Sequence, residues 1–207
     1  GQLRERDRSL ELTKEFLEIA GVESIDELRS TSVEKILDFQ TSQYLSANKT
    51  FDFFAPTGGG VGIESDILNT ASQSPVQFVV GTNKDENKIW AAFDPALADA
   101  DAAMWNEFCI ESFGDNATNA RQTYEKMRPY ESPRDLMSAI STDTGFRQRA
   151  ISFAEARVAN NQPTWMYWFT WPTPFMDGAL GCCHALDIPF AFGNINAPGA
   201  DMLLGQG

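Results

Sequence analysis

Apolar residues near the start of the chain recur at the spacing of an amphipathic helix. Four of them share one side of such a helix: Leu12, Phe16, Ile19 and Ala20. Gly21 follows directly, and glycine commonly ends helices because it tolerates the left-handed conformation. The pattern predicts short helices over residues 9–47.

Two further helix starts are marked by capping residues in this region. Ser24 and Thr31 are each followed three residues later by an acid, Glu27 and Glu34, as in a capping box. Beyond them, residues 51–62 are rich in aromatic side chains and glycine and predict an irregular connection. Its three consecutive glycines, at 58–60, are interpreted as a surface turn, because no strand precedes them and no Lys-Ser/Thr pair follows.

Two runs of β-branched and aromatic residues predict strands at residues 75–81 and 164–171. Both are nearly continuous in apolar character, which is typical of strands buried on both faces of a parallel sheet. The second run stops at Pro172, and proline cannot continue a central strand. We therefore expect two interior strands of a larger sheet.

The stretch between the two strands is mostly helical, over residues 95–160. Ser132 and Pro133 predict a helix start, with serine as the cap and proline in the first turn. Asp143 is the expected cap of the next helix. Five residues would line one face of that helix: Phe146, Ala150, Phe153, Ala154 and Val158.

Composition limits the classes of partner. The chain has 207 residues, 43% of them hydrophobic, which is enough for one sizeable core or two small ones. A net charge of −13 argues against nucleic acid or an anionic membrane as partners. No apolar run approaches the ~20 residues that span a bilayer. Three cysteines are too few for a disulfide framework, so the compartment stays open between cytoplasmic and secreted.

The candidate chemistry lies just beyond the two predicted strands. His184, the only histidine, sits about ten residues past the second strand, and Asp85 and Glu86 follow the first. Parallel strands bring such segments to one edge of a sheet, where an acid can orient a histidine for acyl transfer. Two plainer interpretations stay open: a structural histidine, and acids that cap the next helix.

A nucleophile is not evident. Ser112, in Ile-Glu-Ser-Phe-Gly, lacks the first glycine of a nucleophile elbow and is expected on a helix surface. Cys182 and Cys183 lie too close in sequence to His184 for its ring to approach them, so packing is the favoured interpretation. The cysteines and His184 lack zinc-site spacing, and no metal or other cofactor is expected.

Three stretches together resemble the C-terminal half of type-B carboxylesterases, the family that includes the cholinesterases. The first ends in Gly-Thr-Asn-Lys-Asp-Glu at Glu86, and the second runs over residues 142–146. The third joins the aromatic strand to Gly-Cys-Cys-His-Ala-Leu-Asp-Ile-Pro-Phe-Ala-Phe-Gly, which contains His184. The order of the motifs and the separation of 98 residues between Glu86 and His184 are similar to the family pattern.

The chain also departs from that pattern. The family's nucleophilic serine and oxyanion loop belong to its N-terminal half, and neither is found here. Asn87 stands where the family usually has glycine, and Asp187 stands where it usually has glutamate. The chain ends before the family's usual tryptophan-containing terminal region. We therefore expect residues 1–207 to be a single C-terminal segment cut from a larger domain, with the missing N-terminal half as its partner.

The resemblance implies an α/β fold, the C-terminal part of an α/β-hydrolase, mostly helical with the last strands of the central sheet. It implies hydrolysis of small-molecule carboxylic esters through an acyl-enzyme, with Glu86 and His184 as the acid and histidine of the triad. Ile89 and Trp90 would line the substrate gorge, although Trp90 fits equally well as a core residue. Alone, the segment is expected to be inactive and to self-associate through unpaired strands.

Two rival functions remain at this point. Some cholinesterase-like proteins keep the fold as adhesion or binding modules without the catalytic serine. The retained acid and histidine, Glu86 and His184, argue against that alternative. The second rival is a free-standing helical interaction domain, which the two apolar strands argue against, because they would lack partners.

Overall fold

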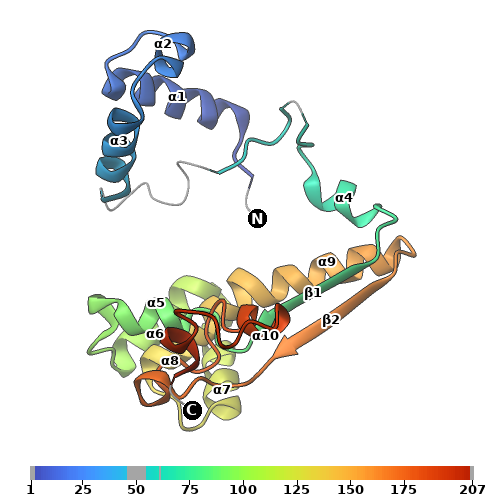
Figure 1. The fold of residues 1–207 in the computed structure, drawn as a ribbon. Coiled ribbons are helices and arrows are strands. Elements are labelled where there is room, and N and C mark those ends of the chain that lie inside the picture. Colours follow the sequence, from blue (N-terminus) through green and yellow to red (C-terminus); the bar gives the residue numbers. More distant parts are fainter. Residues whose placement is uncertain (1–2, 46–54, 61, 206–207) are drawn as a thin grey trace. The chain divides into compact units, whose positions relative to one another are not determined.

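The computed structural model describes residues 3–45, 55–60 and 62–205. The chain divides into two compact units, Gly1–Gln73 and Ser74–Gly207, and each is described by itself. Figure 1 shows the helices of the first unit and the sheet and helices of the second. None of the helices in the described residues is long and apolar enough to cross a membrane.

The first unit is helical. Its helices are α1 (Arg6–Ala20), α2 (Ile25–Arg29), α3 (Val33–Leu45) and α4 (Ile67–Ser72). Gly21 ends α1 in the left-handed conformation, with φ of 67°, as predicted. Leu12 is buried and Phe16 packs against it, so this part of the predicted apolar stripe is confirmed. Ile19, in contrast, is exposed.

Of the two predicted caps in this unit, one is confirmed and one is wrong. Ser24 begins α2, and its hydroxyl accepts a hydrogen bond from the backbone N–H of Glu27. Before α3 the capping residue is Ser32, which accepts from the N–H of Lys35 at 3.3 Å. Thr31 lies one position too early, and its hydroxyl instead donates to the carbonyl of Glu27.

The glycine-rich stretch forms a turn. The N–H of Gly59 donates to the carbonyl of Ile63 at 3.0 Å, and Gly60 and Ile63 form an antiparallel bridge. The interpretation of glycines 58–60 as a turn is confirmed. Residues 51–54 of the predicted aromatic connection lie outside the described residues.

The second unit contains a two-stranded sheet. Strands β1 (Phe78–Asn83) and β2 (Thr164–Phe169) pair in parallel, from Phe78 opposite Thr164 to Asn83 opposite Phe169. Helix α9 (Gln148–Ala159) contacts both strands and runs alongside them in Figure 1. Both predicted strands exist, and β1 begins later and ends later than its apolar run. Parallel pairing brings the segments after the two strands to the same edge of the sheet.

The expectation that both strands are buried on both faces is wrong for the described chain. Along β1 the side chains pass from exposed at Phe78 and Val79 to buried at Thr82 and Asn83. Most of β2, including Trp165, is also exposed. Contacts from α9 and from the π-helical turn Asp143–Arg147 that precedes it leave much of the sheet exposed.

The remaining α-helices of this unit are α5 (Lys88–Phe93), α6 (Ala102–Phe113), α7 (Ala117–Met127), α8 (Pro133–Thr142), α10 (Ile188–Ala191) and α11 (Asp201–Leu204). Short 3₁₀ turns lie at Pro95–Leu97, Gly114–Asn116 and Phe175–Gly178. Ser132 caps α8 by accepting from the N–H of Asp135, and Pro133 occupies the first turn, as predicted.

The predicted cap at Asp143 is wrong. Helix α8 continues without a break through a π-helical turn, Asp143–Arg147, into α9, so no free helix start exists there. The carboxylate of Asp143 instead accepts from the hydroxyl of Tyr124 at 2.7 Å and pairs with Arg147 at 3.3 Å. Along α9, Ala150 and Ala154 are buried as predicted, whereas Val158 is exposed.

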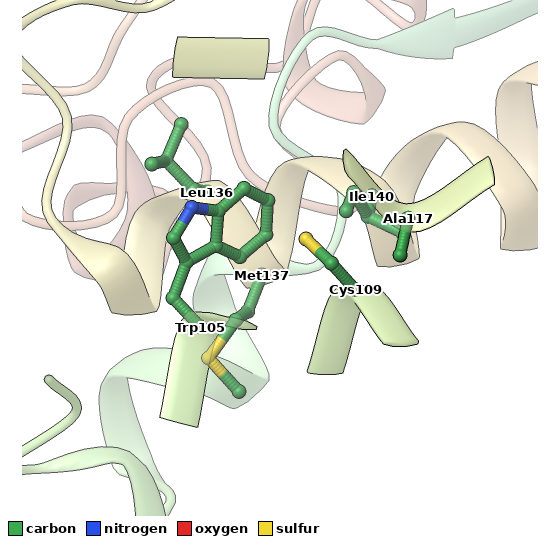
Figure 2. Close-up of a cluster of buried hydrophobic side chains, with 6 residues drawn as sticks. All are labelled: Trp105, Cys109, Ala117, Leu136, Met137 and Ile140. Atoms are coloured by element: carbon green, nitrogen blue, oxygen red, sulfur yellow. The ribbon is translucent and has the colours of Figure 1, made fainter. Parts of the chain in front are cut away.

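Two apolar clusters build the core of this unit. The larger joins α6, α7 and α8 and is shown in Figure 2: Trp105, Cys109, Ala117, Leu136, Met137 and Ile140. The indole N–H of Trp105 is satisfied by the carboxylate of Glu125 at 3.0 Å. The smaller cluster lies in the segment after β2: Leu180, Cys182, Cys183 and Leu186. This second cluster is continuous in sequence with His184 and anchors its loop.

Candidate active site

Glu86 lies in the turn between β1 and α5. Its side chain is only 7% exposed. One carboxylate oxygen, Oε1, accepts the backbone N–H of Asn83 at 2.7 Å. The other oxygen is therefore directed to a different partner. The alternative that Asp85 and Glu86 cap α5 is wrong, because the capping position is Asn87 and no side chain caps that helix.

His184 is brought to Glu86 by the parallel pairing. Its Nδ1 lies 2.6 Å from Oε2 of Glu86, although 98 residues separate them. The backbone N–H of His184 also donates to the carbonyl of Glu86 at 3.2 Å, so backbone and side chain are held by one residue. The predicted meeting of these two side chains at one sheet edge is confirmed.

The contact fixes which ring nitrogen is available. A carboxylate can only accept, so the proton of a neutral ring is on Nδ1, and Nε2 carries a lone pair. The His184 side chain is 45% exposed. Within the described residues, hydrogen bonds to His184 come from Glu86 alone. The ring is oriented on one side and open on the other.

Two aromatic rings pack against the imidazole. Trp90, on α5, lies 5.0 Å from the His184 ring, and Phe146, in the π-helical turn, lies 5.3 Å from it, both measured between centroids. Trp90 and Phe146 stack on each other at 6.1 Å. Sequence reasoning placed Phe146 on a helix face and at the end of the second family-like stretch, and nothing in the spacing showed that the π turn would carry it to the histidine.

The two residues predicted to line the gorge have different surroundings. Trp90 is 43% exposed and contacts His184. Ile89 is partly buried and packs against the smaller apolar cluster, next to Leu180 and the two cysteines. Only Trp90 lies beside the candidate chemistry, and the substrate-binding role of both stays a prediction.

The adjacent cysteines are packing residues. Cys182 and Cys183 are both fully buried, and the thiol of Cys182 donates to the carbonyl of Phe169 at 2.9 Å. Burial raises the pKa of Cys182 to about 11 and also raises the pKa of Cys183. Their thiols are therefore protonated near neutral pH and are poor nucleophiles. The described residues hold no group of three or more His, Cys, Asp or Glu that could bind a metal ion.

A chain of hydrogen-bonded polar side chains, Asn83, Asp187 and Tyr167, lies next to the pair of Glu86 and His184. Asn83 is fully buried, and its Nδ2 donates to the carbonyl of Cys183 at 2.7 Å and to Oδ1 of Asp187 at 3.1 Å. The other oxygen of Asp187 accepts the hydroxyl of Tyr167 at 2.6 Å, which raises the pKa of Tyr167 to about 12. Sequence reasoning noted Asp187 only as a departure from a family pattern and missed both partners.

Gly81 on β1 and Asn87 after Glu86 each make a contact near the site. Gly81 is the cross-strand partner of Tyr167, and a Cβ on it would overlap the tyrosine ring. Asn87, which replaces the family's usual glycine, donates its N–H to the hydroxyl of Thr142 at 3.0 Å. Neither residue disturbs the contact between Glu86 and His184.

Comparison with known proteins places the chain in a family. The model of the carboxylesterase family matches residues 4–202, so the chain belongs to that family. The predicted family is thereby confirmed.

Two curated relatives are named as a hydrolase and an esterase. Phenmedipham hydrolase of Pseudarthrobacter oxydans is 25% identical over 193 residues, covering 92% of this chain and 38% of the relative. Para-nitrobenzyl esterase of Bacillus subtilis strain 168 is 24% identical over 203 residues, covering 92% of this chain and 39% of the relative. The chain thus spans about two fifths of the length of these relatives.

Solved structures agree on the fold. A para-nitrobenzyl esterase superposes with a TM-score of 0.68 at 21% identity, over 100% of this chain and 42% of that chain. A carboxylesterase of Geobacillus stearothermophilus superposes with a TM-score of 0.72 at 22% identity, over 99% of this chain and 42% of that chain. The predicted fold class, part of an α/β-hydrolase, is confirmed.

Proposed function

We propose that the complete protein to which this chain belongs is a serine carboxylesterase, and that this chain supplies the acid and the histidine of its triad. The observation that carries the proposal is the contact of 2.6 Å between Nδ1 of His184 and the buried carboxylate of Glu86, which leaves Nε2 open. The nucleophilic serine and the oxyanion donors come from an N-terminal half outside these 207 residues.

In this mechanism His184 transfers protons and Glu86 stays ionised. Nε2 of His184 accepts the serine proton as the serine oxygen attacks the ester carbonyl, and then gives it to the departing alcohol. Water then attacks the carbonyl of the acyl-enzyme in the same way: Nε2 of His184 takes a proton from the water and returns it to the serine oxygen as the acid is released. Glu86 holds the ring in the required tautomer and stabilises the imidazolium that forms each time. The buried position of Glu86 and its bond from the Asn83 N–H support this role.

Trp90 and Ile89 are the proposed substrate-contacting residues, and we expect Trp90 to contribute more to substrate binding than Ile89. Because Trp90 stacks beside the imidazole, an ester bound at Nε2 would meet its indole. In the complete enzyme, Trp90→Ala should change the ranking of ester substrates by acyl or alcohol group. Ile89→Ala is the matched comparison on the same helix. Equal loss for all esters in Trp90→Ala, with a large drop in melting temperature, would instead make Trp90 a core residue.

The triad assignment is tested by ester hydrolysis in the complete protein. His184→Ala should abolish nearly all turnover. Glu86→Gln should lower kcat strongly, since replacing the acid by an amide costs about 10⁴-fold in a serine protease triad. Because the triad acts as a unit, the double variant should be little worse than His184→Ala alone. Glu111→Gln, an exposed carboxylate on α6, is the matched control and should leave turnover unchanged.

A non-catalytic cholinesterase-like binding module remains the alternative. The intact contact between Glu86 and His184 favours the enzyme, because a binding module has no need of an oriented imidazole. Hydrolysis that survives His184→Ala would overturn the assignment. The 207-residue chain alone is proposed to be inactive, as a segment that lacks the nucleophile, and an ester assay on the isolated chain tests this.

A further inference from the structure

We infer that Asp85, held by Arg128, is a positioning residue that fixes the His184 loop onto the Glu86 turn. The catalytic meaning of this inference rests on the proposed function, whereas its structural content does not. Asp85 follows the same strand as Glu86, yet its carboxylate accepts a hydrogen bond from the backbone N–H of Cys182, in the segment that precedes His184.

Asp85 joins the two loops through both its backbone and its side chain. Its N–H donates to the carbonyl of Cys182 at 2.9 Å, and its Oδ2 accepts the N–H of Cys182 at 3.1 Å. Cys182 is two residues before His184. With the backbone and side-chain hydrogen bonds between His184 and Glu86, four hydrogen bonds join residues 85–86 to residues 182–184. The side chain of Asp85 supplies one of them from a buried position.

The close approach of the loops depends on glycine at 181. Gly181 adopts φ of 55°, a conformation that suits glycine. A Cβ at this position would lie 2.8 Å from Oδ2 of Asp85 and 3.1 Å from Cδ of Lys88. The loop therefore passes directly over the Asp85 carboxylate, which leaves no space for a side chain between them.

Arg128 provides the countercharge. Its Nη1 lies 3.4 Å from Oδ1 of Asp85 and 2.9 Å from Oε1 of Glu131. Both Asp85 and Arg128 are largely shielded from solvent, with side chains 8% and 17% exposed. A buried carboxylate carries a desolvation cost unless it is paired and hydrogen-bonded, and Arg128 supplies an ion pair for Asp85. Through this ion pair Arg128, at the end of α7, connects that helix to the turn that holds the His184 loop.

The position of the imidazole can be read directly by NMR. In the complete protein the Nδ1–H resonance of His184 is identified by its loss in His184→Ala. A hydrogen bond to Glu86 shifts this resonance strongly downfield and slows its exchange. Asp85→Ala removes both the acceptor for Cys182 and the partner of Arg128, and should move the resonance upfield and broaden it. This readout does not depend on esterase activity.

Conservative and control variants separate positioning from general destabilisation. Asp85→Asn keeps an oxygen acceptor but loses the ion pair, and should give an intermediate shift. Arg128→Gln should resemble it without altering the turn. Asp135→Asn is the matched control, because Asp135 pairs with Lys88 on α5 at 3.6 Å without touching the His184 loop. All spectra are recorded at a temperature where unfolding curves show the variant folded.

Kinetics gives a second, independent readout. In the complete enzyme Asp85→Ala should lower kcat by on the order of 100-fold with little change in KM, as for a misplaced reacting group. An unchanged Nδ1–H resonance in folded Asp85→Ala would overturn the inference. If Asp85→Ala does not fold, unchanged resonances in both Asp85→Asn and Arg128→Gln would overturn it, and a shift in either would support it. A shifted resonance in a protein without esterase activity would support the inference and refute the proposed function.

Discussion

The two ends of the small parallel sheet differ in character. At the amino-terminal end, Val79 is 63% exposed and Trp165 opposite it is 53% exposed. What holds this end is Arg157 of α9, fully buried, which donates to the carbonyl of Val76 and to the hydroxyl of Thr164. At the carboxyl end, Thr82 and Asn83 of β1 are buried and polar, and Asn83 donates a hydrogen bond to the loop after β2.

The two ends differ in how far their exposed and polar groups find partners within the chain. At the carboxyl end of β1 most polar groups are paired within the chain, through Asn83, Asp85 and Glu86. The side-chain oxygen of Asn83 is a buried acceptor without a partner among the described residues. At the amino-terminal end Phe78 packs edge-on against Phe153 of α9, whereas Val79 and Trp165 remain exposed. The candidate site is thus preorganised by the chain itself, whereas the sheet that carries it retains accessible apolar surface. Three predictions test this contrast.

The largest effect is expected at Asn83. In Asn83→Ala the carbonyl of Cys183 and Oδ1 of Asp187 both lose their buried donor. A buried polar group without its partner costs about 1–3 kcal/mol, so the free energy of unfolding should fall by several kcal/mol. Urea unfolding followed by tryptophan fluorescence measures it. Asn119→Ala, on the exposed surface of α7, is the control, and equal changes in both would contradict a buried polar network.

An intermediate effect is expected at Asp187. Its hydrogen bond with the Tyr167 hydroxyl raises the pKa of that tyrosine from its ordinary value to about 12. The raised pKa means that the folded state holds the proton more tightly. The resulting stabilisation is complete below about pH 10 and is lost as the pH rises toward 12. In Asp187→Asn the pKa of Tyr167 should fall back toward 10, about its ordinary value.

Tyrosinate absorbance during an alkaline titration measures this shift. Subtracting the titration of Tyr167→Phe from that of the parent isolates the Tyr167 signal among the four tyrosines. Asp177→Asn is the control, since this exposed carboxylate lies in the same loop, whereas the hydroxyl of Tyr167 bonds to Asp187. A Tyr167 pKa that is the same in the parent and in Asp187→Asn would contradict the polar chain.

The smallest change in stability is expected at the exposed end. Val79→Lys should alter the free energy of unfolding by about 0.5 kcal/mol or less, because the side chain is largely in solvent already. It should reduce self-association of the isolated 207-residue chain instead. Light scattering should show a mass that grows with salt for the parent, as screening weakens the repulsion of a net charge of −13. A parent that stays monomeric at every salt concentration would refute docking through these strands.

Sequence patterns predicted the elements that depend on neighbouring residues. The two strands, the cap at Ser132 and the end of α1 at Gly21 follow from local propensity and were confirmed. The wrong caps at Thr31 and Asp143 have local causes too. Ser32 is an equally good cap one position later, and α8 runs on through a π turn that no composition signal marks.

The meeting of Glu86 and His184 was also within reach of the sequence. Two apolar runs of strand length imply a parallel pair when helices separate them, and a parallel pair brings the following loops to one edge. That rule holds regardless of the 98 residues between the two side chains. It predicts proximity of the loops, and the side-chain chemistry at positions 86 and 184 then suggests the hydrogen bond.

The partners of that pair were decided by the tertiary structure alone. Phe146 reaches the imidazole through a π turn, and Asp85 reaches the N–H of Cys182 across 97 residues because glycine at 181 lets the loop approach. The sequence determined which segments are strands, which are helices and which residues can titrate, since these depend on local propensity and side-chain chemistry. The pairing of buried polar groups depends on how the loops pack at the sheet edge. Hydrogen bonds require this packing to be precise to a fraction of their length, and only the folded chain defines it.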